Sequence, residues 1–151
     1  MKINPRKLNA FLFFKLPAAY ITGVRVKSID RNRCTVSVKH RWINQNPFKS
    51  MFWAVQGMAA ELTTGVLLIE KIQESKKNIA MLLVENNAQY FKKATGRIYF
   101  ECTQGEIVDE AIARAIDTGE GQTLTLTSVG TNSEGVEVSK LNFTWSIKLR
   151  S

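Results

Sequence analysis

The sequence has little from which a metal centre could be built. It contains one histidine and two cysteines, Cys34 and Cys102, and the cysteines form no Cys-x-x-Cys motif. Because protein zinc sites draw their ligands from clustered His, Cys and carboxylate side chains, we expect no bound metal. Each cysteine lies among alternating apolar residues. This setting is typical of small buried thiols in a reducing compartment, so we expect a cytoplasmic protein.

Long apolar segments and long runs of like charge are also absent. The apolar patch FLFF near the amino terminus ends at Lys15, which leaves it too short for a signal-peptide core or a membrane span. No run of five Lys or Arg residues occurs, so a tail that binds nucleic acid is not indicated. No repeat of 20 to 50 residues is evident, which excludes a solenoid or propeller.

The length and charge bound what remains. With 151 residues, the chain has room for one domain over 1–151, of which 1–20 form an N-terminal helix and lead-in. Its 21 Lys and Arg residues outnumber 13 Asp and Glu residues, giving a net charge of +8. Such a field favours anionic partners such as nucleic acid, a membrane surface or a phosphorylated small molecule. A merely soluble basic surface explains it equally well.

The first forty residues predict a short helix followed by a pair of strands. Asn4 before Pro5 marks a helix start, since Asn caps the first turn and proline is tolerated at the first helical position. Pro17 ends the helical run. Apolar and polar residues then alternate over 24–29 and 34–42, so we expect a hairpin with one buried face.

The rest of the chain predicts one long helix, more strands and a second helix. The run IAMLLV is continuously apolar, so its strand is expected to be buried on both faces. A lone long helix after a hairpin, followed by strands joined by turns, indicates an α+β fold in which an antiparallel sheet of five or six strands curls round the helix. We expect the long helix over 50–69, strands over 78–91, 98–103, 124–126 and 141–149, a second helix ending at Gly119, and a turn over 132–135.

The long helix carries a stripe with an unusual composition. Ser50 is a reasonable N-cap for it. Trp53, Gly57, Glu61 and Gly65 then follow at steps of four, which places them along one line of the helix. A glycine inside a helix costs roughly 1 kcal/mol relative to alanine. Two glycines on one stripe therefore indicate a face that another backbone or a ligand approaches closely.

Glu61 is the one carboxylate on this face, and two interpretations of it stay open. A buried carboxylate is costly unless it is hydrogen-bonded, paired or protonated. It is either a structural group paired with a cation or a backbone amide, including one across a subunit interface, or a catalytic base with a shifted pKa.

The loop and helix from Trp42 to Gly65, together with the order of elements, resemble a hotdog-fold domain. The resemblance is specifically to acyl-CoA thioesterases related to the phenylacetate-pathway enzymes, and above all to members whose function is unassigned. In that family a loop asparagine, often followed by proline, precedes a His-Gly-Gly element at the helix start, and an acidic residue follows. Here Asn46 and Pro47 match the loop, and Glu61, fifteen residues after Asn46, falls where the acid belongs.

The helix start departs from the family pattern. Phe52, Trp53 and Ala54 stand where His-Gly-Gly would be. In the family, the glycine lets a backbone N–H point at the thioester carbonyl as an oxyanion donor. The resemblance implies that Phe52, Trp53, Ala54 and Gly57 contact the substrate, with a helix amide as the remaining donor.

A basic turn is the other matching region. Lys92, Lys93 and Arg97 fall where the family often meets the phosphates of coenzyme A. A solvated basic turn explains these residues equally well.

The resemblance implies hydrolysis of an acyl-CoA or acyl-carrier-protein thioester. Glu61 would act as general base on a water or as nucleophile, and Asn46 would orient the water or the thioester carbonyl. Coenzyme A would take part only as a portion of the substrate, with no other cofactor. The family's sites lie between subunits, so we expect a homodimer or a dimer of dimers, without a membrane span and without nucleic acid.

A second hypothesis is that the protein binds a ligand without catalysing a reaction. A non-catalytic hotdog domain would bind an acyl or lipid-like ligand, with Met51, Phe52 and Trp53 lining the pocket. Bound fatty acid without turnover distinguishes this hypothesis from the first.

Overall fold

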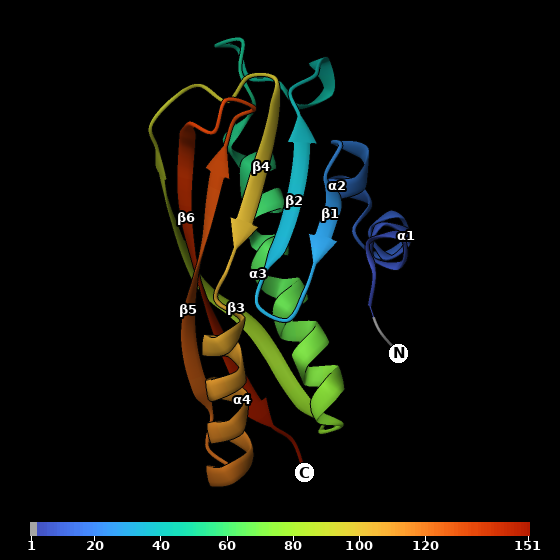
Figure 1. The fold of residues 1–151 in the computed structure, drawn as a ribbon, viewed down its shortest axis with the longest axis vertical. Coiled ribbons are helices and arrows are strands. Elements are labelled where there is room, and N and C mark those ends of the chain that lie inside the picture. Colours follow the sequence, from blue (N-terminus) through green and yellow to red (C-terminus); the bar gives the residue numbers. More distant parts are fainter. Residues whose placement is uncertain (1–2) are drawn as a thin grey trace.

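A curled sheet of six antiparallel strands wraps around one long helix, α3, in the computed structural model, which describes residues 3–151 (Figure 1). The strand order across the sheet is β1-β2-β4-β5-β6-β3, which leaves β1 and β3 at the edges. The strands are β1 (Arg25–Ile29), β2 (Cys34–Lys39), β3 (Ile79–Tyr90), β4 (Arg97–Cys102), β5 (Gln122–Thr131) and β6 (Glu137–Leu149); the α-helices are α1 (Pro5–Lys15), α2 (Pro17–Ile21), α3 (Trp53–Ser75) and α4 (Gly105–Thr118). This is the predicted α+β hotdog arrangement.

The amino-terminal helix begins and ends where the sequence predicts. The side chain of Asn4 accepts a hydrogen bond of 3.0 Å from the backbone N–H of Lys7, and Pro5 occupies the first helical position. Pro17 stops α1 and starts the short helix α2. Residues 1–2 of the expected lead-in lie outside the described residues. No helix within 3–151 is long and apolar enough to cross a membrane.

The central helix α3 differs from the prediction at both ends. Its N-cap is Phe52 rather than Ser50, because the Ser50 hydroxyl is used by Asn46 inside the preceding loop. The helix also continues six residues beyond Ile69, to Ser75, and stops at Lys76 in the left-handed conformation. An almost wholly apolar run predicted the helix, and this run ends near Ile69 because the last turn and a half is less apolar.

The predicted burial of strand β3 and the predicted end of strand β2 were both wrong. Strand β3 was expected to be buried on both faces, yet Leu82 and Val84 are exposed. Only the alternate residues Met81 and Leu83 pack against the core, because a single face of the strand is turned toward it. The second strand of the hairpin ends at Lys39 rather than Trp42, whose side chain is exposed.

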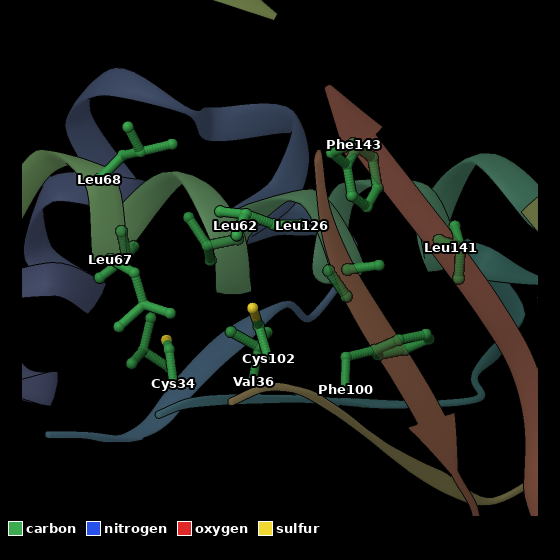
Figure 2. Close-up of a cluster of buried hydrophobic side chains, with 14 of the residues drawn as sticks. Cys34, Val36, Leu62, Leu67, Leu68, Phe100, Cys102, Leu126, Leu141 and Phe143 are labelled. Atoms are coloured by element: carbon green, nitrogen blue, oxygen red, sulfur yellow. The ribbon is translucent and has the colours of Figure 1, made fainter. Parts of the chain in front are cut away.

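The core lies between α3 and the concave face of the sheet. Figure 2 shows Leu62, Leu67 and Leu68 of α3 opposite side chains from β2, β4, β5 and β6. The facing residues include Cys34, Val36, Phe100, Cys102, Leu126, Leu141 and Phe143, all buried. One long face of α3 is thereby fixed against the sheet, so residues on its other face are left to line cavities.

Both cysteines are buried free thiols in this core, at paired positions of β2 and β4. Burial raises the pKa of Cys34 to about 12 and that of Cys102 to about 11. Because the thiolate is the reactive form, we expect Ellman's reagent to label neither cysteine in the native protein at pH 8 and both after unfolding in guanidinium. Labelling of either thiol before unfolding would contradict this burial.

Candidate functional site

Glu61 lies on the face of α3 that the sheet does not cover. Its side chain lines an apolar cavity of about 350 Å³, which we call the Glu61 cavity. Helix α1, helix α3 and the strands β1, β3 and β6 supply the wall; its members besides Glu61 include Leu8, Leu12, Leu16, Val26, Leu62, Gly65, Met81 and Trp145. A smaller cavity of about 220 Å³ is lined by α1, α2 and α3 and shares Leu16, Glu61 and Leu62 with the first. The carboxylate is therefore reachable from both.

The Glu61 carboxylate is half-buried and unpaired. Among residues 3–151, no hydrogen bond or ion pair engages its oxygens, although Lys7 and Gln73 line the same cavity. Burial raises the pKa of Glu61 above its ordinary value of 4.5, because desolvation disfavours the charged form. The described residues thus supply no partner within the chain, and the structural interpretation is left with a partner across a subunit interface.

The glycines of the stripe do not bring another backbone close. A Cβ added to Gly65 would lie 3.5 Å from the indole ring of Trp145 and 3.6 Å from Oε1 of Glu61, which is ordinary contact. A Cβ added to Gly57 would meet no atom of the described residues within 4 Å. Trp145 is held in place by its N–H, which donates to the Thr64 hydroxyl over 3.0 Å. Of the two predicted neighbours of the stripe, another backbone is thus not found among the described residues of one chain, and a ligand stays a prediction.

Asn46 shapes the loop before α3. Its Oδ1 accepts hydrogen bonds from the backbone N–H groups of Phe48 and Ser50, and its Nδ2 donates to the Met51 carbonyl over 3.2 Å and to the Ser50 hydroxyl over 3.0 Å. Both ends of the amide are engaged within five residues of chain. Asn46 does not line the Glu61 cavity.

A third cavity, of about 610 Å³, lies at the start of α3, and we call it the helix-start cavity. Buried Gln56 lines it with an Oε1 atom that has no partner among the described residues. Lys93 reaches across to donate to the carbonyl of Phe48 over 3.1 Å. The other lining residues are Asn46, Pro47, Ser50, Met51, Phe52, Trp53, Tyr90, Phe91, Lys92 and Ala94.

The first turn of α3 offers two free donors beside this cavity. Within residues 3–151, neither the Trp53 N–H nor the Ala54 N–H has an acceptor, and the Phe52 side chain provides no cap. Such amides at a helix N-terminus favour an anionic group. Trp53 and Glu61 are eight residues apart, about 12 Å along the helix axis at 1.5 Å per residue.

The structure thus gathers most of the predicted site residues in two places. Asn46, Phe52, Trp53, Lys92 and Lys93 line the helix-start cavity, whereas Glu61 lines the Glu61 cavity and the smaller cavity next to it. The remaining predicted contact residues line none of these cavities. Ala54 and Gly57 are half-buried on α3, and the Arg97 guanidinium donates to the Ser37 hydroxyl over 3.3 Å.

Sequence reasoning missed the residues that enclose Glu61. The sequence identified Trp145 only as one apolar position in a strand, and Leu8, Phe11 and Leu12 only as one side of a short helix. Their shared cavity is formed by segments distant in the chain, so no local spacing could have identified it. Gln56 was likewise missed, because it is a single polar residue within an apolar run of the sequence.

A family model described as a domain of unknown function, DUF4442, matches residues 5–147. No curated protein matches the chain in sequence. A protein of unknown function from Chlorobaculum tepidum has the same fold, with a TM-score of 0.82 at 20% identity over 97% of this chain and 98% of that one. So does a protein of unknown function from Pseudomonas aeruginosa, described as a probable thioesterase: TM-score 0.82, 19% identity, 97% of each chain. A thioesterase from Haemophilus influenzae aligns with a TM-score of 0.76 at 12% identity, over 99% of this chain and 93% of that one.

Proposed function

The chain belongs to the DUF4442 family, and from that premise we propose that it hydrolyses the thioester of an acyl-CoA or an acyl-carrier protein. The observation that carries the proposal is the Glu61 carboxylate, which is unpaired by the described residues, raised in pKa and set in an apolar cavity. Similar folds among proteins described as thioesterases support it. The apolar cavity suits an acyl chain, and the carboxylate at its wall suits a reaction at the end of that chain.

In the proposed reaction Glu61 acts as general base. It takes a proton from a water molecule whose oxygen attacks the thioester carbonyl, and the thiolate of coenzyme A then leaves and is protonated. Attack by the carboxylate itself, through a mixed anhydride that water cleaves, gives the same products. The raised pKa makes Glu61 a stronger base than an exposed glutamate. No cofactor is needed beyond the coenzyme A of the substrate.

The remaining site residues are proposed to bind the other parts of the substrate. The Trp53 and Ala54 amides would stabilise the oxyanion, with Phe52 and Gly57 beside them. Lys92 and Lys93 would meet the phosphates of coenzyme A at the helix-start cavity. Arg97, whose guanidinium contacts Ser37, would complement them from the start of β4.

A homodimer would bring the two halves of the site together. Glu61 and the Trp53 amide lie about 12 Å apart along one helix, too far to act on one carbonyl, which needs both groups within about 3 Å. A second copy that placed its helix start opposite Glu61 would close this distance. We propose that the active unit is such a dimer, alone or paired into a tetramer.

Turnover of a thioester panel tests the proposal. We expect release of coenzyme A from acyl-CoA substrates of at least one chain length, with kcat/KM in the range of about 10⁴–10⁸ M⁻¹ s⁻¹ for a natural substrate. A panel from acetyl to palmitoyl, repeated with acyl-carrier-protein thioesters, covers the substrate class. Rates no higher than those without protein across the whole panel would sink the proposal.

The role of Asn46 has its own test. If Asn46 orients the water or the carbonyl, we expect Asn46→Ala to lower kcat/KM about 100-fold to 1,000-fold, as loss of one donor to the reacting group does. Ser50→Ala is the matched control, since it removes a hydroxyl that bonds to Asn46 in the same loop. Equal losses in kcat/KM for both variants, with matching losses in melting temperature, would assign Asn46 to the loop alone.

A non-catalytic acyl-binding domain is the second candidate. It is favoured by the departures at the helix start, where exposed Phe52 and Trp53 rings lie 5.8 Å apart, and by an Asn46 amide that is engaged within its loop. Buried Met51 lines the same cavity. Fatty acid that co-purifies with the protein, together with no turnover in the panel, would support this candidate.

We also propose that the protein works in the cytoplasm. The free thiols of Cys34 and Cys102 support a reducing compartment. Nucleic acid is not proposed as a partner.

A further inference from the structure

The positive charge of the chain is concentrated at its amino-terminal end. Residues 1–29 contain six Lys and Arg residues and no Asp or Glu, and Asp30 is the first acidic residue in the chain. Six of the eight units of net positive charge therefore belong to the first fifth of the sequence. The other 122 residues carry 15 Lys and Arg against 13 Asp and Glu, so this end of the sequence contributes most of the net charge that would attract an anionic partner.

The same end exposes a group of large apolar side chains. Phe13 is 53% exposed and Phe14 is 74% exposed, at the carboxyl end of α1. With Phe11, Leu16 and Ile21, which are also exposed, they form what we call the N-terminal patch. Exposed Arg6, Lys7 and Lys15 lie on the same helix. Figure 1 shows α1 and α2 on the outside of the sheet, beyond its β1 edge.

Contacts on the inner side of α1 fix which residues face outward. Leu8 and Leu12, one turn apart, are buried in the core. The Asn9 side chain pairs with the backbone of edge strand β1, accepting from the Val26 N–H over 2.8 Å and donating to the Val26 carbonyl over 3.1 Å. These contacts fix α1 against the core and strand β1. Phe13 and Phe14 are therefore exposed while the helix is packed in place.

The exposed aromatic rings of the N-terminal patch pack against neighbouring rings. Phe13 packs edge-to-face against Phe14, with centroids 4.9 Å apart, and against Tyr20 of α2 at 5.1 Å. The Arg25 guanidinium lies 3.5 Å from the centroid of the Tyr20 ring and donates to the Tyr20 carbonyl over 2.7 Å. Rings held in this way keep their apolar edges in water, which is costly unless another surface covers them.

We propose that the N-terminal patch docks on the surface of an anionic lipid bilayer. Helices with aromatic and basic side chains lie in the headgroup region, where the rings enter the acyl boundary and the cations meet anionic headgroups. Complementary charge selects this occupant over a second copy of the chain, because two copies of this end would bring together like charges. The docked helix lies on the membrane without crossing it. The inference is independent of turnover by Glu61.

Vesicle sedimentation of the full chain tests this docking. We expect the protein to pellet with vesicles of phosphatidylglycerol and phosphatidylcholine at about 0.1 M salt, and to be released at about 1 M salt as screening shortens the reach of the charges. It should stay in solution with phosphatidylcholine alone. Phe13→Ser/Phe14→Ser should weaken partitioning at least about tenfold, and Lys7→Glu/Lys15→Glu at least about fivefold per side chain.

Control variants separate membrane docking from a general loss of exposed apolar surface and from misfolding. Trp42→Ser/Ile43→Ser removes an equally exposed apolar pair outside the patch and should leave partitioning unchanged. Circular dichroism and light scattering of each variant report folding and oligomeric state. The proposal is overturned if anionic vesicles do not pellet the wild type. It is also overturned if Phe13→Ser/Phe14→Ser binds vesicles as strongly as the wild type does. A third contrary outcome is a wild-type oligomer that does not bind vesicles and that the Phe13→Ser/Phe14→Ser substitutions dissociate, since the patch would then be a contact between subunits.

Discussion

Glu61→Gln is expected to lower kcat for thioester hydrolysis about 100-fold to 10,000-fold, the contribution typical of a general base. Glutamine preserves the shape of the side chain at the wall of the Glu61 cavity, so substrate binding and KM should change little. The measurement is the rate of coenzyme A release under saturating substrate. Glu74→Gln, an exposed position near the end of the same helix, is the matched control and should keep full activity.

The same substitution should stabilise the protein at neutral pH. Burial raises the pKa of Glu61, so the folded state resists its ionisation more than the unfolded state does. Above the raised pKa the folded protein bears this cost in full; below the ordinary value of 4.5 both states are protonated and the cost is absent. Glu61→Gln should therefore raise the free energy of unfolding at pH 7–8, by about 0.5–2 kcal/mol, and the gain should vanish as the pH falls below 4.5.

The pH profile of kcat links these two effects. Because the ionised carboxylate is the base, activity should fall as the pH drops through the raised pKa of Glu61. A Glu61→Gln protein with wild-type kcat would remove Glu61 from catalysis. A variant that is less stable than the wild type at pH 8 would show instead that the carboxylate has a stabilising partner in the assembled protein.

Local sequence signals predicted where the helices and strands of this fold lie better than they predicted which of their side chains are buried. Asn4 and Pro5 predicted the start of α1 because a cap and a proline act within one turn. The apolar run of β3 could not reveal an exposed face, because the face that packs against the core is set by pairing with distant β6. The end of α3 was missed for a similar reason, since its last turns are held by tertiary contacts such as the one at Lys71.

The candidate site was predictable only in part. Glu61 stood out because a single carboxylate in an apolar helix has an evident energetic cost. Its surroundings did not, because α1 and Trp145 approach it from opposite ends of the chain. Asn46 was identified by resemblance, and only the hydrogen bonds of its loop reveal that its amide is already engaged.

Asp109→Ala is expected to lower the free energy of unfolding by about 2–3 kcal/mol, although it removes a partly exposed side chain far from Glu61. The Lys71 ammonium donates to both carboxylate oxygens of Asp109 over 2.9 Å, which ties α3 to α4. The side chain of Lys71 is only 3% exposed and that of Asp109 is 39% exposed. Without Asp109 the ammonium is left unpaired, and breaking a fully buried pair costs about 3–5 kcal/mol. Water that reaches the Asp109 position reduces this cost.

Lys71→Met separates charge burial from packing at the same contact. It keeps an apolar stem in the core and leaves behind a carboxylate that water can reach, so the expected loss is below about 1 kcal/mol. The double variant Lys71→Met/Asp109→Ala should then be more stable than Asp109→Ala alone, since no buried charge remains. Urea midpoints with unchanged m values give the comparison. If Lys71→Met costs as much as Asp109→Ala, the pair itself, rather than the unpaired ammonium, would account for the stability of the α3–α4 contact.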